Sequence, residues 1–248
     1  MADLEICWTK PARLPVLEAT QIHVWAALLD QSFSERADCG SILAADEVER
    51  ASRFHFPKDQ DRFIRARTTL RTILASYLQI DPRAVRFDYG RHGKPALTNR
   101  QPDPPIHFNL SHSDEVALIA VTRVGPVGVD VERIRSMEDI DEISSRFFSR
   151  HEVALLSALR GEEKTEAFFD LWTRKEALMK ADGSGLTDAL IQFDTLSNVE
   201  RNAAHLDAEG GTVPLSGWTL RLLQPAKGCK GAVAVAKGGL EVVTGRWG

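Results

Sequence analysis

Hydrophobic residues recur along this chain with two different periods, and this alternation of helical and strand-like segments limits the fold more than any other feature. In residues 59–78 they recur at helical spacing, which predicts a helix whose buried face holds Phe63, Ala66, Leu70, Leu74 and Tyr77. Two short apolar runs, residues 106–110 and 116–121, flank Ser111-His112-Ser113-Asp114 and predict a hairpin of two strands. The chain therefore mixes helices with strands.

Other segments extend this mixed pattern in both directions. Ser149 stands three residues before Glu152, which is the capping-box pattern of a helix start. Gly183 and Gly185 are expected to end a long helix. Two further helices are expected at residues 45–54 and 164–181. Four further strands are expected at residues 22–29, 127–131, 218–222 and 231–236.

Composition excludes several classes of protein. With 248 residues, 43% apolar and 27% charged, the chain can build a packed core in one large domain or two small ones. Its net charge of −4 argues against a nucleic-acid binder, which would carry a basic field. The acidic start and the lack of a long apolar run predict a cytoplasmic protein without a membrane segment. Neither a disulfide framework nor a zinc site is expected from three widely spaced cysteines: Cys7, Cys39 and Cys229.

The segment Gly128-Val129-Asp130-Val131-Glu132 is the first candidate for chemistry. In a strand, Asp130 and Glu132 would share one face with Cα atoms about 7 Å apart, while the two valines face the core. Two like charges side by side repel, and a Mg²⁺ ion would remove that penalty. The alternative is a solvated strand face with incidental acids.

The segment Trp172-Thr173-Arg174-Lys175-Glu176-Ala177-Leu178-Met179-Lys180 is the second. Trp172, Glu176 and Lys180 lie four residues apart and therefore on one helix face. Glu176 would complete a metal site of three carboxylates, and Lys180 would meet a phosphate, with Lys175 as a further cation. The alternative is a core tryptophan beside an ordinary surface Glu–Lys pair.

The segment His107-Phe108-Asn109-Leu110-Ser111-His112-Ser113 is the third. A serine hydrolase is excluded, because there is no GxSxG pattern and adjacent residues of an extended segment point apart. Hydroxyls and an imidazole suit phosphate binding, whereas the alternative is a polar turn. Near it in sequence, a basic cluster favours anion binding as a group, although each single arginine is expected on a solvated helix face: Arg50, Arg53, Lys58, Arg62, Arg65, Arg67 and Arg71.

These segments, taken in order with Gly93-Lys94-Pro95 and Phe147-Phe148-Ser149-Arg150-His151-Glu152, resemble the signature of Sfp-type 4′-phosphopantetheinyl transferases over residues 50–186. The resemblance implies an α+β fold of two pseudo-symmetric halves in one chain with coenzyme A between them. The implied halves are residues 1–124, on the nucleotide side of coenzyme A, and residues 125–248, with the metal-binding carboxylates and the carrier-protein contacts. The turn Val124-Gly125-Pro126 fits this boundary.

The resemblance also assigns roles to single residues. Asp130, Glu132 and Glu176 match the Mg²⁺ ligands, and Lys180 matches a contact to the pyrophosphate. Glu176 and Lys180 are the expected catalytic residues, with Glu176 as the base. The expected coenzyme A contacts are Arg50, Arg53, Lys94, Ser111, His112 and Lys180. Glu47 departs from the family pattern, because a basic residue is expected at its position. Glu152 matches a recurrent glutamate of the family, but its place in a capping box explains it without a chemical role.

The implied activity is Mg²⁺-dependent transfer of 4′-phosphopantetheine from coenzyme A to a serine of an apo acyl, polyketide or nonribosomal-peptide carrier protein, with release of 3′,5′-ADP. The expected partners are the carrier and coenzyme A, with no nucleic acid and no membrane, and the enzyme is expected to be a monomer. Phe147, Phe148 and Arg150 are candidates for carrier contacts. Two alternatives remain open: another Mg²⁺-dependent phosphoryl-transfer enzyme or nuclease, and a carrier-binding protein without activity.

Overall fold

The computed structural model describes residues 8–11, 14–30, 41–90, 93–98, 104–183, 194–196 and 217–248. Cys7, Cys39 and Gly185, which entered the sequence analysis, lie outside them. Within the described residues no helix has the length and apolar character needed to cross a membrane.

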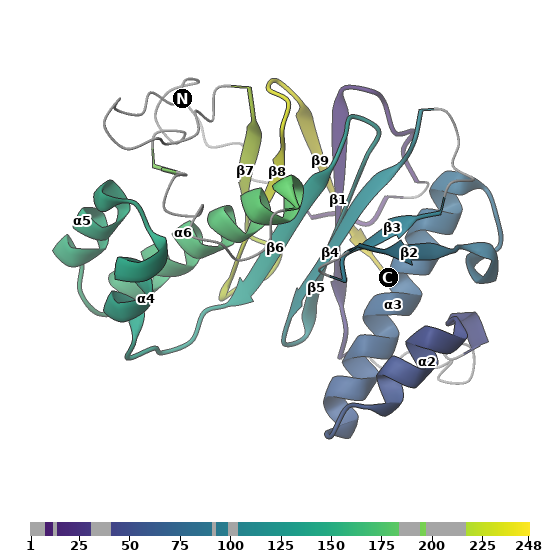
Figure 1. The fold of residues 1–248 in the computed structure, drawn as a ribbon, viewed down its shortest axis with the longest axis horizontal. Helices are drawn as coiled ribbons and strands as arrows, with labels where there is room; N and C mark the ends of the chain where they lie inside the picture. The colour runs from purple at the N-terminus through teal and green to yellow at the C-terminus, as the bar shows by residue number, and fades with distance from the viewer. Residues whose placement is uncertain are drawn as a thin grey trace.

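Two β-sheets lie face to face at the centre of the molecule (Figure 1). The first has the order β4-β5-β1-β9, formed by His107–Ser113, Val116–Thr122, Gln21–Leu28 and Glu241–Trp247. The second is antiparallel with the order β6-β8-β7, formed by Val127–Arg133, Cys229–Val235 and Thr219–Leu223. A small ladder, β2 (Phe87–Tyr89) with β3 (Pro95–Leu97), stands beside them.

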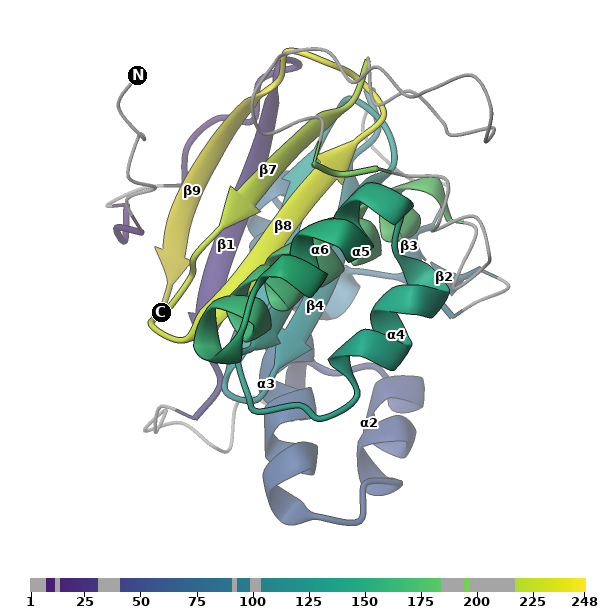
Figure 2. The ribbon, with the colours of Figure 1, turned by 90° about the vertical axis from the view of Figure 1, so that its left-hand side faces the viewer.

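Helices cover the outer faces of both sheets (Figure 2). On the side of the first sheet lie α2 (Ala45–Ser52) and the long α3 (Pro57–Leu78), followed by the short 3₁₀ helix η1 (Pro82–Ala84). On the side of the second sheet lie α4 (Ile140–Phe147), α5 (Arg150–Ala158) and the long α6 (Gly161–Asp182). The layers are therefore helix, sheet, sheet and helix, which is the α+β fold that the sequence predicted.

Strand β5 contributes to two hydrophobic cores, one between α3 and the first sheet and one between the two sheets. All seven of its residues are buried, and they alternate in direction. Ala117, Ile119 and Val121 point toward α3, whereas Val116 and Leu118 point toward the second sheet. The apolar run that predicted this strand is therefore continuous because both faces are covered.

Most predicted elements are confirmed, and the hairpin is corrected in one respect. The strand predicted for residues 106–110 continues to Ser113, because β4 pairs with β5 from His107↔Thr122 to Ser113↔Val116. The turn is made instead by Asp114 and Glu115, and Asp114 has a φ of 49°. Ser111, His112 and Ser113 consequently alternate along a strand instead of forming a polar turn.

The last strand, β9, was not predicted. It runs parallel to β1, from Gln21↔Glu241 to Ala27↔Trp247. A Cβ on Gly245 would lie 2.4 Å from the ring of Trp25, so only glycine permits this pairing. The C-terminal strand thus completes a sheet that begins near the N-terminus.

A chain of hydrogen bonds is buried where β1 meets α3. Trp25 Nε1 donates to the hydroxyl of Tyr77 (2.9 Å), and that hydroxyl lies 2.7 Å from Nδ1 of the fully buried His23. His23 Nε2 lies 3.2 Å from Oε1 of Gln21. Because an amide oxygen only accepts, His23 carries its proton on Nε2 and accepts from Tyr77 through Nδ1. Burial lowers the pKa of His23 to about 4, against the opposing charge of Glu241.

We predict that this histidine makes the protein lose stability in mild acid. An unfolded histidine titrates near 6.5, so between pH 6.5 and about 4 the unfolded state binds more protons than the folded state. The contribution of neutral His23 is intact at pH 7 and should fall by roughly 3 kcal/mol as the pH drops through this window. Urea unfolding at pH 7, 6, 5 and 4 measures it.

The control is His23→Gln, which keeps a polar side chain but does not titrate. Its free energy of unfolding should fall less steeply between pH 6.5 and 4 than that of the unmodified protein. Parallel pH profiles for the two proteins would contradict the assignment.

Candidate active site

Side chains of β4 join the two sheets by bonding to β6. Asn109 Oδ1 accepts from the backbone N–H of Val129 (2.9 Å), and Ser111 Oγ donates to Asp130 Oδ1 (2.9 Å). Two residues further on, Ser113 Oγ donates to Glu132 Oε2 (2.9 Å). Every second residue of β4 therefore faces β6, and we call this row of contacts the β4–β6 seam. It also sets two of the three predicted metal ligands, Asp130 and Glu132, beside hydroxyl groups.

Asp130 is the centre of the site. Its side chain is only 4% exposed, and Oδ1 accepts from Ser111 and from Lys180 Nζ (2.6 Å). Its second oxygen, Oδ2, is buried without a hydrogen-bond partner among the described residues. Burial raises the pKa of Asp130, and the charge of Lys180 opposes that rise. A buried carboxylate oxygen left without a donor is an expensive arrangement unless a cation or donor meets it.

Two further carboxylates interact with Asp130. The pKa of Glu132 is raised first by burial and then by the charge of Asp130. On α6, burial raises the pKa of Glu176 to about 7, and the charges of Asp130 and Glu132 add to this while Lys180 opposes it. The three carboxylates therefore repel one another. Over the part of the chain that the structure describes, no group of three or more His, Cys, Asp or Glu side chains is already arranged to hold a metal ion.

Gly128 lets α6 approach β6 closely enough to bring Lys180 to Asp130. A Cβ at Gly128 would stand 1.9 Å from the carbonyl oxygen of Ala177 and 2.5 Å from the backbone nitrogen of Ala181. The helix backbone thus lies directly on this glycine. A side chain of any size would push α6 away from the strand that carries the carboxylates.

Lys94 connects the first half to the end of α6. Its ammonium group donates to the carbonyl oxygens of Val127 (3.0 Å) and Lys180. Burial, and then the charge of Lys180, lowers the pKa of Lys94 to about 8. Lys94 also lines a cavity of about 560 Å³, together with residues of β3, β4 and the start of β6.

His112 points to the other side of β4 from Ser111. Its side chain is exposed, yet desolvation, followed by the charges of Lys180, Arg62 and Arg50, lowers its pKa. Asp59 opposes this shift. At pH 7 the imidazole is therefore neutral, and positively charged side chains surround it. Ser111 donates to Asp130, and His112 points to the opposite side of the strand. This geometry agrees with the exclusion of a Ser–His hydrolase pair.

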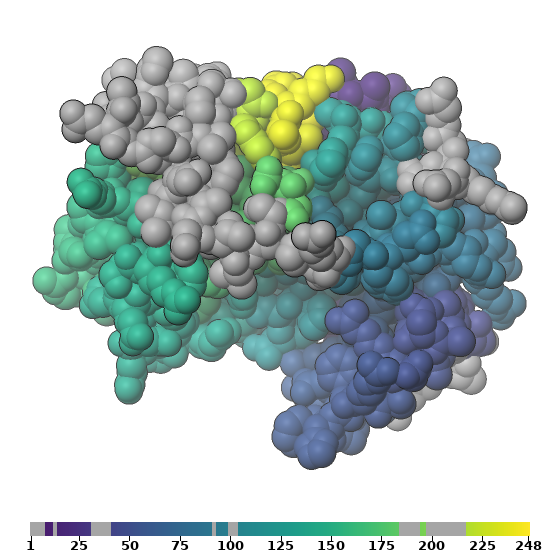
Figure 3. All heavy atoms as spheres, viewed as in Figure 1, coloured from purple at the N-terminus to yellow at the C-terminus, as the bar shows by residue number. Residues whose placement is uncertain are grey.

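A second cavity, of about 620 Å³, lies against α2 and α3. Arg50 and Arg53 both line it. The guanidinium of Arg50 lies 5.6 Å from the ring centroid of Phe63, and Arg53 forms an exposed ion pair with Glu49 (2.5 Å). In the space-filling view the blue surface around α2 projects beyond the body of the molecule, and a recess separates it from the green surface of helices α4–α6 (Figure 3).

Three arginines that were expected on solvated helix faces are buried, so that expectation is wrong for them. Arg62 donates to Asp30 (2.9 and 3.0 Å) and Asp114 (3.2 Å). Arg67 and Arg71 both bind Glu47. The spacing of charges along the chain gave no sign of these pairs, because the partners lie 20 to 52 residues apart.

The structural interpretation of Glu152 is confirmed. It caps α5 with Ser149, accepts from Thr195 and forms an ion pair with Lys175 (2.8 Å). The Glu152 and Lys175 side chains are 0% and 1% exposed. Lys175 is consequently held in the core and does not supply the further cation that was expected of it. Phe148 is also a core residue, at 3% exposure, while Phe147 is only partly buried.

Comparison with known proteins gives a consistent result. The chain matches two family models: the 4′-phosphopantetheinyl transferase superfamily over residues 126–234, and the N-terminal region of 4′-phosphopantetheinyl transferase over residues 30–123. It is 39% identical to 4′-phosphopantetheinyl transferase HetI of Nostoc sp. strain PCC 7120, over 92% of each chain. It is 32% identical to 4′-phosphopantetheinyl transferase Sfp of Bacillus subtilis strain 168, over 62% of this chain and 66% of that relative.

We predict that Gly128→Ala separates α6 from β6. The added methyl group overlaps the helix backbone, so the free energy of unfolding should fall by about 3 kcal/mol or more. Urea unfolding monitored by circular dichroism measures this loss.

Gly125→Ala is the matched control, because a Cβ at Gly125 meets nothing within 4 Å. It should change the free energy of unfolding by less than about 0.5 kcal/mol. Equal effects of the two substitutions would contradict the close approach at Gly128.

Proposed function

The chain belongs to the 4′-phosphopantetheinyl transferase superfamily and is a transferase of the Sfp type, and on that premise we propose that it transfers the 4′-phosphopantetheine group of coenzyme A to a carrier-protein serine in a Mg²⁺-dependent reaction that releases 3′,5′-ADP. Coenzyme A is the co-substrate that membership of this family implies.

One observation carries the proposal: residues far apart in sequence converge on Asp130. Ser111 comes from β4, Asp130 from β6 and Lys180 from α6, and their polar atoms lie within 3.1 Å of one another. Lys94 joins them through the backbone of Lys180. An acid flanked by a hydroxyl and an ammonium group suits a pyrophosphate held beside a cation.

The chemistry of the three carboxylates supports a magnesium ion at this site. Asp130 Oδ2 has no donor within the described part of the chain, and the charges of Glu132 and Glu176 repel that of Asp130. Asp130, Glu132 and Glu176 would hold the ion, since Mg²⁺ prefers carboxylates together with substrate phosphates. When bound, it would supply positive charge to the pyrophosphate oxygens.

The protein's own residues have separate tasks in the transfer. The oxygen of the carrier serine forms a bond to the β-phosphorus of coenzyme A while the bond from that phosphorus to the leaving 3′,5′-ADP breaks. Lys180 places its charge next to the pyrophosphate, which stabilises the departing phosphate. Glu176 accepts the serine proton, because its carboxyl group interacts with Lys180 and with the acidic cluster that Asp130 and Glu132 form.

Coenzyme A would extend from this acidic cluster toward the first half. Ser111, His112 and Lys94 would contact the nucleotide side, and Arg50 and Arg53 would face the 3′-phosphate from the cavity beside α2. Residues 1–124 would then form the nucleotide side, and residues 125–248 would hold the carboxylates and the carrier. One chain supplies both sides, so a monomer suffices.

The carrier protein would meet the second half, near the first turn of α5. Arg150 is exposed there, and the partly buried Phe147 carries Arg146 over its ring at 5.0 Å. A surface of this kind, part aromatic and part basic, suits an acidic partner. Acyl, polyketide and nonribosomal-peptide carriers all satisfy that description.

We predict that incubating a panel of apo carrier proteins with this protein, coenzyme A and Mg²⁺ adds one phosphopantetheine group to at least one of them. Intact-protein mass spectrometry measures the gain. EDTA and Asp130→Ala should each abolish it, because both remove the proposed charge balance at the pyrophosphate.

Each of the other possible outcomes leads to a different conclusion about function. A gain that persists in EDTA would overturn the metal requirement. Binding of coenzyme A without any transfer would indicate a carrier-binding protein that lacks activity. Neither binding nor transfer would overturn the proposed function.

We predict that Glu176→Gln lowers kcat by at least about 100-fold, the usual contribution of a positioned base, while coenzyme A still binds. Glu163→Gln, in the first turn of the same helix, is the control and should retain full turnover. Turnover near that of the unmodified enzyme in Glu176→Gln would remove the residue from the mechanism.

A further inference from the structure

Glu47 is a buried carboxylate in the wall of the 620 Å³ cavity, and the proposed chemistry does not use it. Its side chain is 1% exposed. The only other buried residue of α2 is Ala51, so this eight-residue helix has almost no apolar surface with which to dock. The attachment of α2 to the rest of the protein therefore depends on the polar contacts of Glu47.

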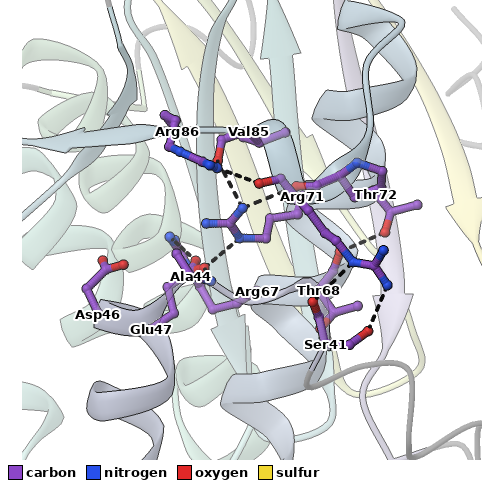
Figure 4. A network of polar contacts seen from close by, with 12 residues as sticks. Ser41, Ala44, Asp46, Glu47, Arg67, Thr68, Arg71, Thr72, Val85 and Arg86 are labelled. Carbon is purple, nitrogen blue, oxygen red and sulfur yellow. Dashed lines mark hydrogen bonds and ion pairs between the residues drawn. The ribbon is translucent and has the colours of Figure 1, made fainter.

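Both carboxylate oxygens of Glu47 bond to α3 and so connect α2 to that helix (Figure 4). Oε1 accepts from Arg67 at 2.5 Å. Oε2 accepts from Arg71 Nε at 2.5 Å and from the backbone N–H of Ala44, the N-cap residue of α2, at 2.9 Å. One carboxylate thus fixes the start of α2 and two arginines of α3.

The two arginines differ in what else they contact. Arg71 is 1% exposed and donates to the carbonyl oxygens of Pro82 and Val85, at 3.2 and 3.0 Å. Arg67 donates to the hydroxyl of Tyr89 (3.2 Å) and lines the cavity. Arg71 therefore anchors Glu47, and Glu47 in turn orients Arg67.

The cavity lining holds three arginines and three carboxylates, Asp46, Glu47 and Glu49, so the positions of its charges matter more than their sum. One carboxylate shared by two guanidinium groups leaves a positive charge in the network. Arg50, on the next turn of α2, rests on the ring of Phe63 and has no carboxylate partner among the residues described. A phosphate entering the cavity would thus meet cations whose positions depend on α2.

We propose that Glu47 is a positioning residue for coenzyme A: by holding α2 against α3, it keeps Arg50, Arg53 and Arg67 around one cavity. This inference rests on the proposed function. It also explains why a carboxylate stands at a position where the family resemblance leads one to expect a basic residue.

The sign of the effect distinguishes positioning from simple electrostatics. If Glu47 acted only through its charge, its neutralisation would attract phosphate more strongly and lower the KM for coenzyme A. If it positions the arginines, neutralisation disorders them and raises that KM, because a guanidinium binds phosphate tightly only when its N–H donors face the phosphate oxygens.

The test compares Glu47→Gln with Glu152→Gln. Glu152 occupies the equivalent place in the second half: it closes the capping box of α5 and pairs with a buried cation of α6, but it does not line the cavity. We expect Glu47→Gln to raise the KM for coenzyme A at least about tenfold, with kcat and carrier KM within about twofold of the unmodified enzyme. Glu152→Gln should lower the melting temperature without a selective change in the KM for coenzyme A.

Glu47→Asp keeps the charge on a shorter side chain and should restore part of the lost affinity, which also provides a test if Glu47→Gln does not fold. Calorimetric titration with coenzyme A alone measures binding without a carrier. An unchanged or tighter dissociation constant in both Glu47 variants would overturn the positioning role while leaving the transferase activity in place. Absence of transfer by the unmodified protein would instead overturn the proposed function.

Discussion

The β4–β6 seam is the interaction on which the rest of the site depends. Two sheets meet there without a shared backbone ladder, and the side chains of Asn109, Ser111 and Ser113 take the place of a partner strand. The same hydroxyls stabilise Asp130 and Glu132, which would otherwise repel each other on one strand face. A shift of one residue along β4 would turn all three side chains away from β6. Strand register and the position of the carboxylates are thus fixed by the same contacts.

In both halves a buried ion pair attaches a short helix to a long one. In each half a glutamate in the first turn of the short helix is fully buried, accepts from the backbone N–H of the N-cap residue and pairs with the long helix: Glu47 with Arg67 and Arg71, and Glu152 with Lys175. A helix of eight or nine residues buries little apolar surface, so a satisfied ion pair specifies its position where packing cannot. The likeness of the two regions is therefore visible in their buried charges.

Local periodicity was sufficient to predict the elements, because a helix stripe or a strand alternation is written in neighbouring residues. It placed Asp130 and Glu132 on one face, and it explained Glu152 as a cap. It could not predict that Arg67 and Arg71 are buried, since an arginine in a helix looks the same whether its partner is solvent or a distant glutamate. Strand β9 was missed for a related reason: its residues are only partly buried, so no clear apolar run marks it.

Because β1 lies between β5 and β9, the protein cannot finish its first sheet until its last strand has been synthesised. During translation the β1 edge that β9 later covers stays open while more than two hundred residues are added between the two strands. An open edge of this kind can pair with another chain. Chaperone binding to the nascent chain would therefore be expected at β1, and fragments that stop after β8 would be prone to associate through it.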